Sequence, residues 1–563
     1  MTLGSWLRKN VNLFSRVRLG TRFAATPLRS KMLELSGLSI IGFQRGERGN
    51  GPFHGINPST GKALAPTYFA AGADEVNRAA ELASKAFDIY RRTPGKQKAL
   101  FLRKIAERIE GLGVTLVTRA VQETALPAAR ISSETARTCN QLRLFAELVE
   151  EGSWVDARID QADPTRQPLR KPDTRSMLRP LGPVAVFCAS NFPLAFSVAG
   201  GDTASALAAG NPVVVKAHHA HPGTAELVGL ALIDAVRDCD LPEGVFSLLF
   251  GPGSQVGTQL MDHPQIKAGG FTGSRSGGQA LMKLAGARPE PIPFYAEMSS
   301  VNPVFVLPGA LREREDEIAT GLHASVTLGA GQFCTNPGLV FLPEDGSRDL
   351  IESLRQKMAA TPAFTMLTGS ISAAYRNAVS VFAHHAAIEE LVWGETESPG
   401  AQCNPAVFKT NARSFLAHPE LATELFGPAT LLVTYSDIAQ LSGIARDLEG
   451  QLTATIHATE TELRQISGLL TTLETKVGRI VLNGFPTGVE VCHSMVHGGP
   501  FPATSDGRST SVGTRAALRF VRPVCYQDLP DSALPDELKD NNPLTIWRLV
   551  NGKFTMAAVS DKL

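Results

Sequence analysis

The chain has almost no net charge, no long apolar run and no closely spaced cysteine pair. Its 55 basic and 54 acidic residues give a formal net charge of +1, so no overall field attracts nucleic acid or an anionic membrane. Apolar stretches such as residues 183–189 are much shorter than the roughly 20 residues that a transmembrane helix needs. We therefore expect a small-molecule partner, no nucleic-acid partner and no membrane span.

The seven cysteines are scattered and contain no C-x-x-C pair, which is typical of reduced thiols and favours a cytoplasmic location. The first 31 residues are the one biased segment, because they contain basic residues and the first acid is Glu34. Their composition fits a targeting presequence, residues ahead of a true start at Met32, or a disordered basic tail.

At 563 residues the chain is too long for one ordinary core, so at least two domains are expected. Apolar residues follow helical spacing over residues 57–155, and after Pro180 short apolar strands alternate with helices, including a helix over 194–209. Repeated β-α-β units predict parallel sheets that bind ligands at the carboxyl ends of their strands. The predicted fold class is α/β, with two doubly wound parallel-sheet domains.

Cys334 stands in the sequence Gly331-Gln332-Phe333-Cys334-Thr335-Asn336-Pro337-Gly338, between a predicted helix and a predicted strand. Backbone amides at such a junction favour the thiolate, which is the nucleophilic form of cysteine. The residue types fit a catalytic thiol and fit equally a small buried side chain in a tight turn.

Other polar residues also end predicted strands. Asn191 can donate its amide to a developing oxyanion, or can be a turn residue before Pro193. Glu297 ends an apolar run where burial would raise its pKa toward that of a general base, or it caps the next turn. Lys216 is placed to hold ribose or phosphate. The nearby histidines, residues 218, 219 and 221, have no acidic or cysteine ligands beside them in sequence, so we predict no metal site.

Two glycine-containing turns are candidate phosphate sites. Gly251, Gly253 and Gly257 follow a strand and precede a helix, although their spacing is not strictly G-x-G-x-x-G. Thr272-Gly273-Ser274 occupies the same kind of position about twenty residues later. Each turn alone also fits a simple strand-to-helix connection.

Taken together, this ordered set of motifs resembles the aldehyde dehydrogenase superfamily over roughly residues 35–530. The motifs are Asn191-Phe192-Pro193, Val215-Lys216, Phe271-Thr272-Gly273-Ser274, Glu297-Met298-Ser299-Ser300-Val301-Asn302-Pro303, Gly331-Gln332-Phe333-Cys334 and Glu424-Leu425-Phe426-Gly427-Pro428.

The resemblance implies a mechanism. Cys334 attacks the aldehyde carbon, Asn191 and the Cys334 backbone N–H stabilise the oxyanion, and Glu297 activates the water that hydrolyses a thioester. It also implies the cofactor site, in which Lys216 and Ser274 bind ribose and phosphates while Glu424 and Phe426 hold the nicotinamide ribose and ring. The full set of predicted cofactor residues is Lys216, His219, Gly253, Gly257, Thr272, Gly273, Ser274, Glu424 and Phe426.

Two departures from the usual family pattern are informative. His219 stands where many NAD-preferring members carry an acid, and an imidazole tolerates a 2′-phosphate that a carboxylate would repel, so we expect NADP to be preferred over NAD. Met298-Ser299-Ser300 replaces the common Leu-Gly-Gly after the glutamate. Together with residues 331–340 and 507–513, this feature resembles the branch that contains α-ketoglutaric semialdehyde (2,5-dioxopentanoate) dehydrogenases and some NADP-linked fatty aldehyde dehydrogenases.

The branch leaves two substrate classes open. A dicarboxylic semialdehyde needs a cation at the far end of the tunnel, and Arg137 and Arg143 are the candidates, although both can equally lie on a solvated helix face. A long-chain fatty aldehyde needs an apolar wall, for which Phe145, Phe192 and Phe485 are suitable. We favour the semialdehyde. A cofactor-independent thiol esterase is the alternative from another class, but it leaves the predicted cofactor residues without a purpose.

The resemblance also assigns domains. These are a basic extension (1–31), a nicotinamide-cofactor-binding domain (32–153 and 182–297), a catalytic thiol domain (298–495), a small β oligomerisation arm (154–181 and 496–530) and a C-terminal tail (531–563). The arm implies a homodimer or homotetramer.

Overall fold

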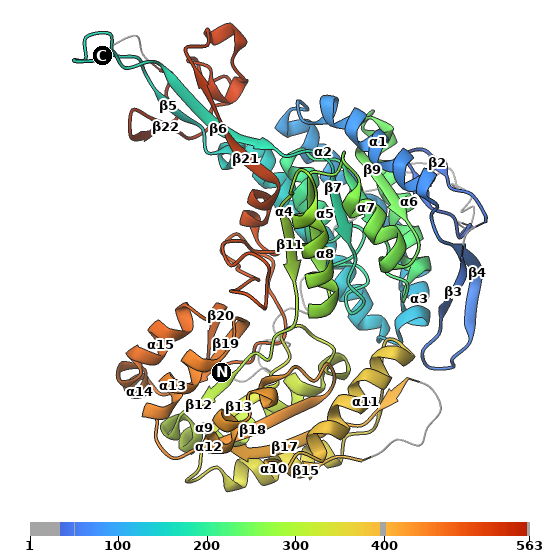
Figure 1. Cartoon of the computed structure of the whole chain (residues 1–563), viewed down its shortest axis with the longest axis vertical. Helices are drawn as coiled ribbons and strands as arrows, with labels where there is room; N and C mark the ends of the chain where they lie inside the picture. Colours follow the sequence, from blue (N-terminus) through green and yellow to red (C-terminus); the bar gives the residue numbers. More distant parts are fainter. Residues whose placement is uncertain (1–33, 50, 395–400, 560–563) are drawn as a thin grey trace, which may run out of the picture. The chain divides into compact units, whose positions relative to one another are not determined.

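The computed structural model describes residues 34–49, 51–394 and 401–559 (Figure 1). The basic extension proposed for residues 1–31 lies outside this part of the chain. Within the described residues, no helix is long and apolar enough to cross a membrane.

The first sheet is built on five parallel strands and has the order β11-β10-β7-β8-β9-β1-β2. In register, Lys216 pairs with Phe187 and Glu297 pairs with Thr272, so the polar residues that end these strands share one edge of the sheet. The strands are β1 (Ile40–Ile41), β2 (Gln44–Arg45), β7 (Val184–Phe187), β8 (Val213–Lys216), β9 (Phe246–Leu249), β10 (Ala268–Thr272) and β11 (Phe294–Glu297).

Helices cover both faces of this sheet, as Figure 1 shows. Val213 and Val215 pack into the core cluster of α2, α4 and α6, whereas Val214 packs into the cluster of α1, α7 and α8. This burial on both faces explains why β8 is an uninterrupted apolar run. The helices are α1 (Ala73–Tyr90), α2 (Gly95–Gly111), α3 (Gly113–Thr124), α4 (Ala128–Glu151), α5 (Gly201–Ala209), α6 (Pro222–Asp238), α7 (Thr258–Asp262) and α8 (Arg275–Ala287).

The helix predicted over 194–209 is wrong in its first seven residues, because α5 begins only at Gly201. The preceding backbone is not helical because its carbonyl groups have other partners: Phe196 accepts from the Ala189 N–H at 2.9 Å, and Ala195 accepts from the Gly201 N–H at 3.1 Å. Glu134 accepts hydrogen bonds from the N–H groups of Leu194 and Ala195, both at 2.9 Å. These residues therefore form a fixed turn directly after Asn191.

The second sheet has the order β15-β17-β18-β13-β12-β19-β20, and all its neighbours except β15 and β17 are parallel. The fold class is thus confirmed as two doubly wound α/β units. The strands are β12 (Val304–Val306), β13 (Leu339–Pro343), β15 (Glu389–Val392), β17 (Ala406–Asn411), β18 (Ala429–Tyr435), β19 (Gln451–His457) and β20 (Val477–Leu482). The helices are α9 (Pro308–Thr327), α10 (Arg348–Ala359), α11 (Gly369–Ala383), α12 (Ala412–Ala417), α13 (Ala439–Asp447), α14 (Glu460–Gln465) and α15 (Ser467–Glu474).

A third, five-stranded sheet contains the segments predicted to form an arm, and its order is β21-β6-β5-β22-β23. Residues after 531 also contribute to it, through two short strands that had no clear signal in the sequence. Its strands are β5 (Arg158–Asp160), β6 (Thr174–Pro180), β21 (Val521–Gln527), β22 (Arg548–Val550) and β23 (Lys553–Thr555). Two further pairs are β3 (Pro52–Ile56) with β4 (Ala63–Phe69), and β14 (Phe364–Thr365) with β16 (Gln402–Cys403).

Candidate active site

Cys334 lies in the loop between the short turn η4 (Leu328–Gly331) and β13, the kind of junction that the glycine-rich sequence predicted. The backbone before it is left-handed, with φ values of 57° at Gly329 and 64° at Gly331. A Cβ on Gly331 would come within 2.2 Å of the Gly427 backbone, so glycine is required there. The thiol-bearing loop is therefore packed against the turn that follows Glu424 and Phe426.

Asn302 fixes the other side of this loop. Its amide Nδ2 donates to the carbonyl oxygens of Cys334 at 2.8 Å and Asn336 at 2.9 Å, and its Oδ1 accepts a hydrogen bond from the Ser300 hydroxyl at 2.9 Å. The side chain is fully buried, so these hydrogen bonds do not compete with water. Asn302 is thus a positioning residue for the thiol.

The Cys334 thiol lies beside a buried glutamate and a buried histidine. His497 Nε2 is 3.5 Å from Cys334 Sγ and 2.8 Å from Glu297 Oε1. The Ser511 hydroxyl donates to the other oxygen of Glu297 at 2.7 Å. The structure therefore brings together two of the predicted catalytic residues and adds His497 and Ser511, which the sequence reasoning missed.

The segment after Val496 reaches the site because it runs beside the end of β11. Glu297 and Thr504 form an antiparallel bridge, and the Met298 N–H donates to the Ala503 carbonyl at 2.7 Å. His497 is 163 residues from Cys334 and 200 from Glu297 along the chain. The only local signal was a histidine followed by two glycines in a loop-rich segment, which does not indicate such distant partners.

The expectation that burial raises the pKa of Glu297 is wrong in its net result. Burial does act in that direction, but His497, through its charge and its hydrogen bond, and the Ser511 hydroxyl lower the pKa below its ordinary value. Burial and the neighbouring Glu297 carboxylate raise the pKa of the Cys334 thiol well above its ordinary value. The resting thiol is therefore protonated, and the adjacent Glu297 carboxylate is the base that can take its proton, because His497 Nε2 carries the proton that it donates to Glu297.

We expect His497→Ala to move the acidic limb of the kcat/KM pH profile to higher pH. Loss of the imidazole removes a hydrogen bond and a source of positive charge that favour the Glu297 anion, so the pKa of Glu297 rises. Rates measured from pH 5 to 9 give the shift. His493→Ala, which alters an exposed histidine of the same segment, is the matched control. An unchanged limb in His497→Ala contradicts the assignment.

Asn191 also lies at the thiol loop, where its Nδ2 donates to the Gln332 carbonyl at 3.0 Å. The amide has a second N–H, which leaves one donor for an oxyanion. Phe192 packs edge-to-face on Phe333 with ring centroids 5.3 Å apart. Together with the hydrogen bonds that Glu134 accepts from the following turn, this contact holds Asn191 beside the cysteine.

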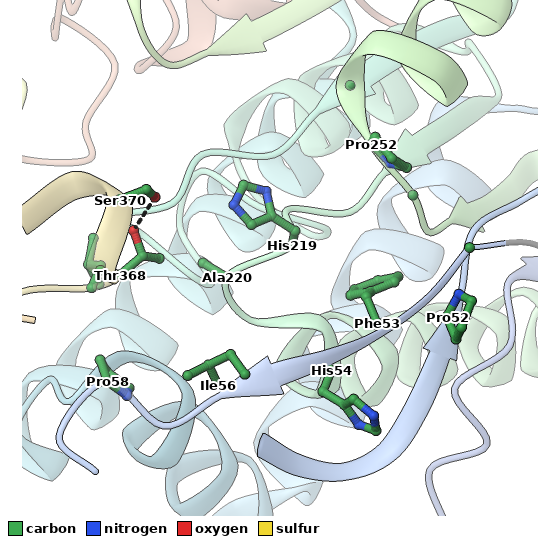
Figure 2. Close-up of a pocket in the computed structure, with 15 residues that line it drawn as sticks. Pro52, Phe53, His54, Ile56, Pro58, His219, Ala220, Pro252, Thr368 and Ser370 are labelled. Atoms are coloured by element: carbon green, nitrogen blue, oxygen red, sulfur yellow. Dashed lines mark hydrogen bonds between the residues drawn. The ribbon is translucent and has the colours of Figure 1, made fainter. Parts of the chain in front are cut away.

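The predicted cofactor residues surround two cavities. The first, of about 650 Å³, is lined by His219, Pro252 and Gly253 together with His54 of β3 and Thr368 at the start of α11 (Figure 2). The pKa of His219 is lowered, by burial first and then by the Lys216 charge, so its imidazole is neutral near pH 7. A neutral imidazole still donates one hydrogen bond and does not repel a phosphate.

The second cavity, of about 950 Å³, is lined by Ser274 and Glu424. Ser274 is the N-cap of α8 and accepts a hydrogen bond from the Gly277 N–H at 3.2 Å, so the positive end of a helix faces the cavity. Burial raises the pKa of Glu424 to about 7. Phe426 and Glu424 line a small pocket together with Phe333 and Gly331.

The remaining predicted cofactor positions lie close to the carboxyl ends of the strands of the first sheet. Lys216 and Thr272 end β8 and β10, and Gly273 follows directly. Gly257 ends the short helical turn η3 (Gly253–Gly257). A Cβ at this position would come within 3.1 Å of the Phe187 ring, so glycine allows the turn to pack closely against that ring.

The two arginines predicted for substrate binding have different surroundings. Arg137 lies over the Phe196 ring, 5.2 Å from its centroid, and its charge interacts with Cys334. Arg143 pairs with Glu110 through two hydrogen bonds, at 2.8 and 2.6 Å, on an exposed helix face. Arg137 and Phe192 thus lie near the loop that carries the Cys334 thiol, whereas Arg143 is not part of the proposed site.

Two clusters in the described residues have donor atoms close enough to surround a metal ion. One is the Cys334 cluster itself. In the other, His385 and His418 each lie 3.2 Å from Glu420. There, His385 Nδ1 accepts a hydrogen bond from the Ala387 N–H, which places the proton of the neutral ring on Nε2, the atom that faces Glu420. That arrangement disfavours metal binding, and the absence of a metal stays a prediction.

The fold and the site define a class of protein, an α/β enzyme with a half-buried thiol beside a buried carboxylate and with two large cavities lined by residues from the carboxyl ends of its strands. Residues 44–503 match the aldehyde dehydrogenase family. The chain belongs to this family, whose members oxidise aldehydes to acids with NAD(P).

Curated relatives cover nearly the whole chain. An α-ketoglutaric semialdehyde dehydrogenase 2 from Azospirillum brasilense is 51% identical over 523 residues, which are 92% of this chain and 100% of that protein. An α-ketoglutaric semialdehyde dehydrogenase from Acinetobacter baylyi is 46% identical over 530 residues, 93% of this chain and 100% of that protein.

Solved structures support the fold at lower identity. Lactaldehyde dehydrogenase from Escherichia coli has a TM-score of 0.75 at 19% identity, covering 87% of this chain and 98% of its own. A 1-pyrroline-5-carboxylate dehydrogenase from Thermus with bound NAD has a TM-score of 0.73 at 21% identity, covering 87% and 92%.

Proposed function

We propose that this enzyme oxidises α-ketoglutaric semialdehyde (2,5-dioxopentanoate) to 2-oxoglutarate through a thioester on Cys334, with NADP preferred over NAD. The observation that carries the mechanism is the contact of the Cys334 thiol with His497, which is in turn hydrogen-bonded to Glu297. The substrate rests on the two relatives at 51% and 46% identity and on the positive charge of Arg137 near the thiol.

The residues present fit a nicotinamide dinucleotide. The α8 N-terminus and Ser274 suit its phosphates, and the cavity beside His219 suits the adenosine end. When bound, the cofactor supplies the hydride acceptor. Lys216 and Glu424 are the residues that would hold its ribose groups, and Phe426 would orient its ring.

The chain's own residues carry the acyl chemistry. Glu297 takes the thiol proton while Cys334 Sγ attacks the aldehyde carbon, and the Asn191 amide and the Cys334 backbone N–H stabilise the oxyanion. After oxidation to the thioester, and once Glu297 has released the thiol proton to solvent, Glu297 accepts a proton from water as the water attacks the acyl carbon. The Ser511 and His497 hydrogen bonds hold the carboxylate in the orientation that this step needs.

The substrate is tested by initial rates of NADPH formation. We expect kcat/KM for α-ketoglutaric semialdehyde to exceed that for a long-chain fatty aldehyde by at least about 100-fold, because only the semialdehyde places a carboxylate near Arg137. The fatty aldehyde is the second candidate, favoured by the apolar cluster that contains Phe192, Phe196 and Phe333. A higher kcat/KM for the fatty aldehyde would overturn the semialdehyde proposal and leave the family assignment intact.

We expect His219→Glu to reverse the cofactor preference. A carboxylate in the cavity of Figure 2 repels the 2′-phosphate of NADP but can accept the ribose hydroxyls of NAD. The ratio of kcat/KM for NADP to that for NAD should fall by about tenfold or more. Because NAD is measured on the same variant, a general loss of activity leaves the ratio unchanged and counts against the role of His219.

We expect the KM for cofactor to rise as the pH falls through about 7, the pKa to which burial raises Glu424. The ionised carboxylate can accept hydrogen bonds from both ribose hydroxyls, whereas the neutral acid carries a proton on one of its oxygens. The neutral acid dominates below that pH. Glu424→Gln, which cannot titrate, should have a high cofactor KM at every pH. A wild-type KM that is independent of pH between 6 and 8 contradicts this role.

The homodimer or homotetramer and the cytoplasmic location stay predictions. The arm sheet, with the order β21-β6-β5-β22-β23, is the element we propose for oligomerisation.

A further inference from the structure

A second arginine near the thiol has no acidic partner. Among the residues that the structure describes, neither Arg137 nor Arg479 forms an ion pair with a carboxylate, whereas the neighbouring Arg130 pairs with Glu134 at 2.6 Å. Arginine stays protonated in proteins, so each of these guanidinium groups is a fixed positive charge. Both lie close enough to Cys334 for their charges to favour its thiolate form.

Both arginines have one buried nitrogen without a hydrogen-bond partner. These atoms are Nη1 of Arg137 and Nε of Arg479. A buried N–H of a charged group that lacks an acceptor is costly, and the cost is larger than for a neutral amide. An anion that reached these nitrogens would satisfy their N–H groups and offset the two charges.

One short loop connects the two arginines. Arg479 donates through Nη1 to the Gly488 carbonyl at 3.0 Å and through Nη2 to the Pro486 carbonyl, and Arg137 donates through Nε to the Val489 carbonyl at 3.4 Å. Residues 486–489 therefore accept hydrogen bonds from two guanidinium groups, that of Arg137 on α4 and that of Arg479 on β20. The remaining N–H groups are fixed in place before any ligand binds, which reduces the entropic cost of binding.

We propose that Arg479 is a specificity-determining residue that acts with Arg137 to bind the carboxylate at the far end of the aldehyde substrate. This inference rests on the proposed function, because it assumes that the aldehyde end is at Cys334. The two guanidinium groups provide more hydrogen-bond donors than a single carboxylate needs. A 2-oxo acid can use the extra donors, because its keto oxygen is a further acceptor beside the carboxylate. Arg479 thus selects a short 2-oxo dicarboxylic semialdehyde over a neutral aldehyde.

The kinetic test compares Arg479→Gln with Arg143→Gln, a matched loss of charge at an exposed, ion-paired position. The substrates are α-ketoglutaric semialdehyde and pentanal, a neutral aldehyde with the same number of carbons. We expect Arg479→Gln to lower kcat/KM for the semialdehyde by about 30-fold or more, mainly through KM, and to change the pentanal value by less than about threefold. Arg143→Gln should leave both substrates unchanged.

Arg479→Lys is the second variant, since it keeps the charge while losing the planar hydrogen-bonding group. We expect its preference for the semialdehyde over pentanal to lie between those of the wild type and Arg479→Gln. Equal losses with both substrates would show that Arg479 only supports the 486–489 loop, and no loss with either would show that it does not bind substrate. Each of these two results overturns the proposal.

Direct binding separates this inference from the proposed function. The probe is 2-oxoglutarate, titrated calorimetrically into Cys334→Ala and into the double variant that also carries Arg479→Gln. We expect the Kd to rise by about 30-fold in the double variant. If wild-type enzyme oxidises no semialdehyde but this difference in Kd remains, the proposed function fails and the anion site stands. If the semialdehyde is oxidised and the Kd values are equal, the Arg479 assignment fails alone.

Discussion

Cys334→Ala should lower kcat for aldehyde oxidation by at least about 10,000-fold while leaving cofactor binding within about twofold of the wild-type value. The thiol forms the covalent bond on which the rest of the proposed mechanism depends, and no other group in the His497–Glu297 cluster can replace it as a nucleophile toward a carbonyl carbon. The alanine side chain also removes no part of the cavities that Ser274 and His219 line.

The measurement for this variant pairs initial rates of NADPH formation with titration of the cofactor. Cys492→Ala is the matched control, because Cys492 is a partly buried cysteine of a nearby loop whose thiol lies 3.7 Å from a serine hydroxyl. We expect the control to keep wild-type rates. Residual activity above about 1% of wild type in Cys334→Ala would mean that another residue starts the reaction.

Glu297→Gln should lower steady-state turnover by about 1,000-fold while still allowing one round of aldehyde oxidation in each site. The amide keeps the shape of the carboxylate and can still hydrogen-bond to His497 and Ser511, but it cannot accept a proton from water. Hydrolysis of the thioester therefore becomes the slow step. Oxidation itself proceeds because the Glu297 charge, which raises the pKa of the Cys334 thiol, is absent from the variant, so the thiolate forms more easily.

Rapid mixing of Glu297→Gln with semialdehyde and NADP separates these steps. We expect a burst of NADPH close to one equivalent of enzyme, followed by a very slow steady state. A burst-free time course at the reduced rate would place Glu297 in thiol activation and not in hydrolysis.

The sequence predicted the parts of the fold that depend on local pattern. The apolar run of β8 is buried on both faces, and the glycine-rich loop before Cys334 does adopt left-handed backbone. Cys334, Glu297 and Asn191 could be selected because each follows or precedes an element end and because their ordered motifs resemble a known family. The sequence pattern indicated the position of each residue, and the resemblance to the family indicated its role.

The residues that were missed act through contacts between distant segments. His497 and Ser511 lie in a loop without periodicity, and they reach Glu297 only because that loop runs along the end of β11. Arg479 lies on an edge strand whose alternation gives no sign of a cation site. The late start of α5 has a similar cause, since the Phe196 carbonyl, which a helix would have used, accepts a hydrogen bond from the Ala189 N–H just after β7.

The most direct test of the covalent mechanism is the intact mass of Glu297→Gln after a single turnover. The protein is mixed with α-ketoglutaric semialdehyde and NADP, quenched in acid within seconds, and digested to locate any added mass. We predict one 2-oxoglutaryl group per chain, on the peptide that contains Cys334, and none on Cys334→Ala treated in the same way. An unmodified protein that has nevertheless produced NADPH would contradict a thioester on Cys334.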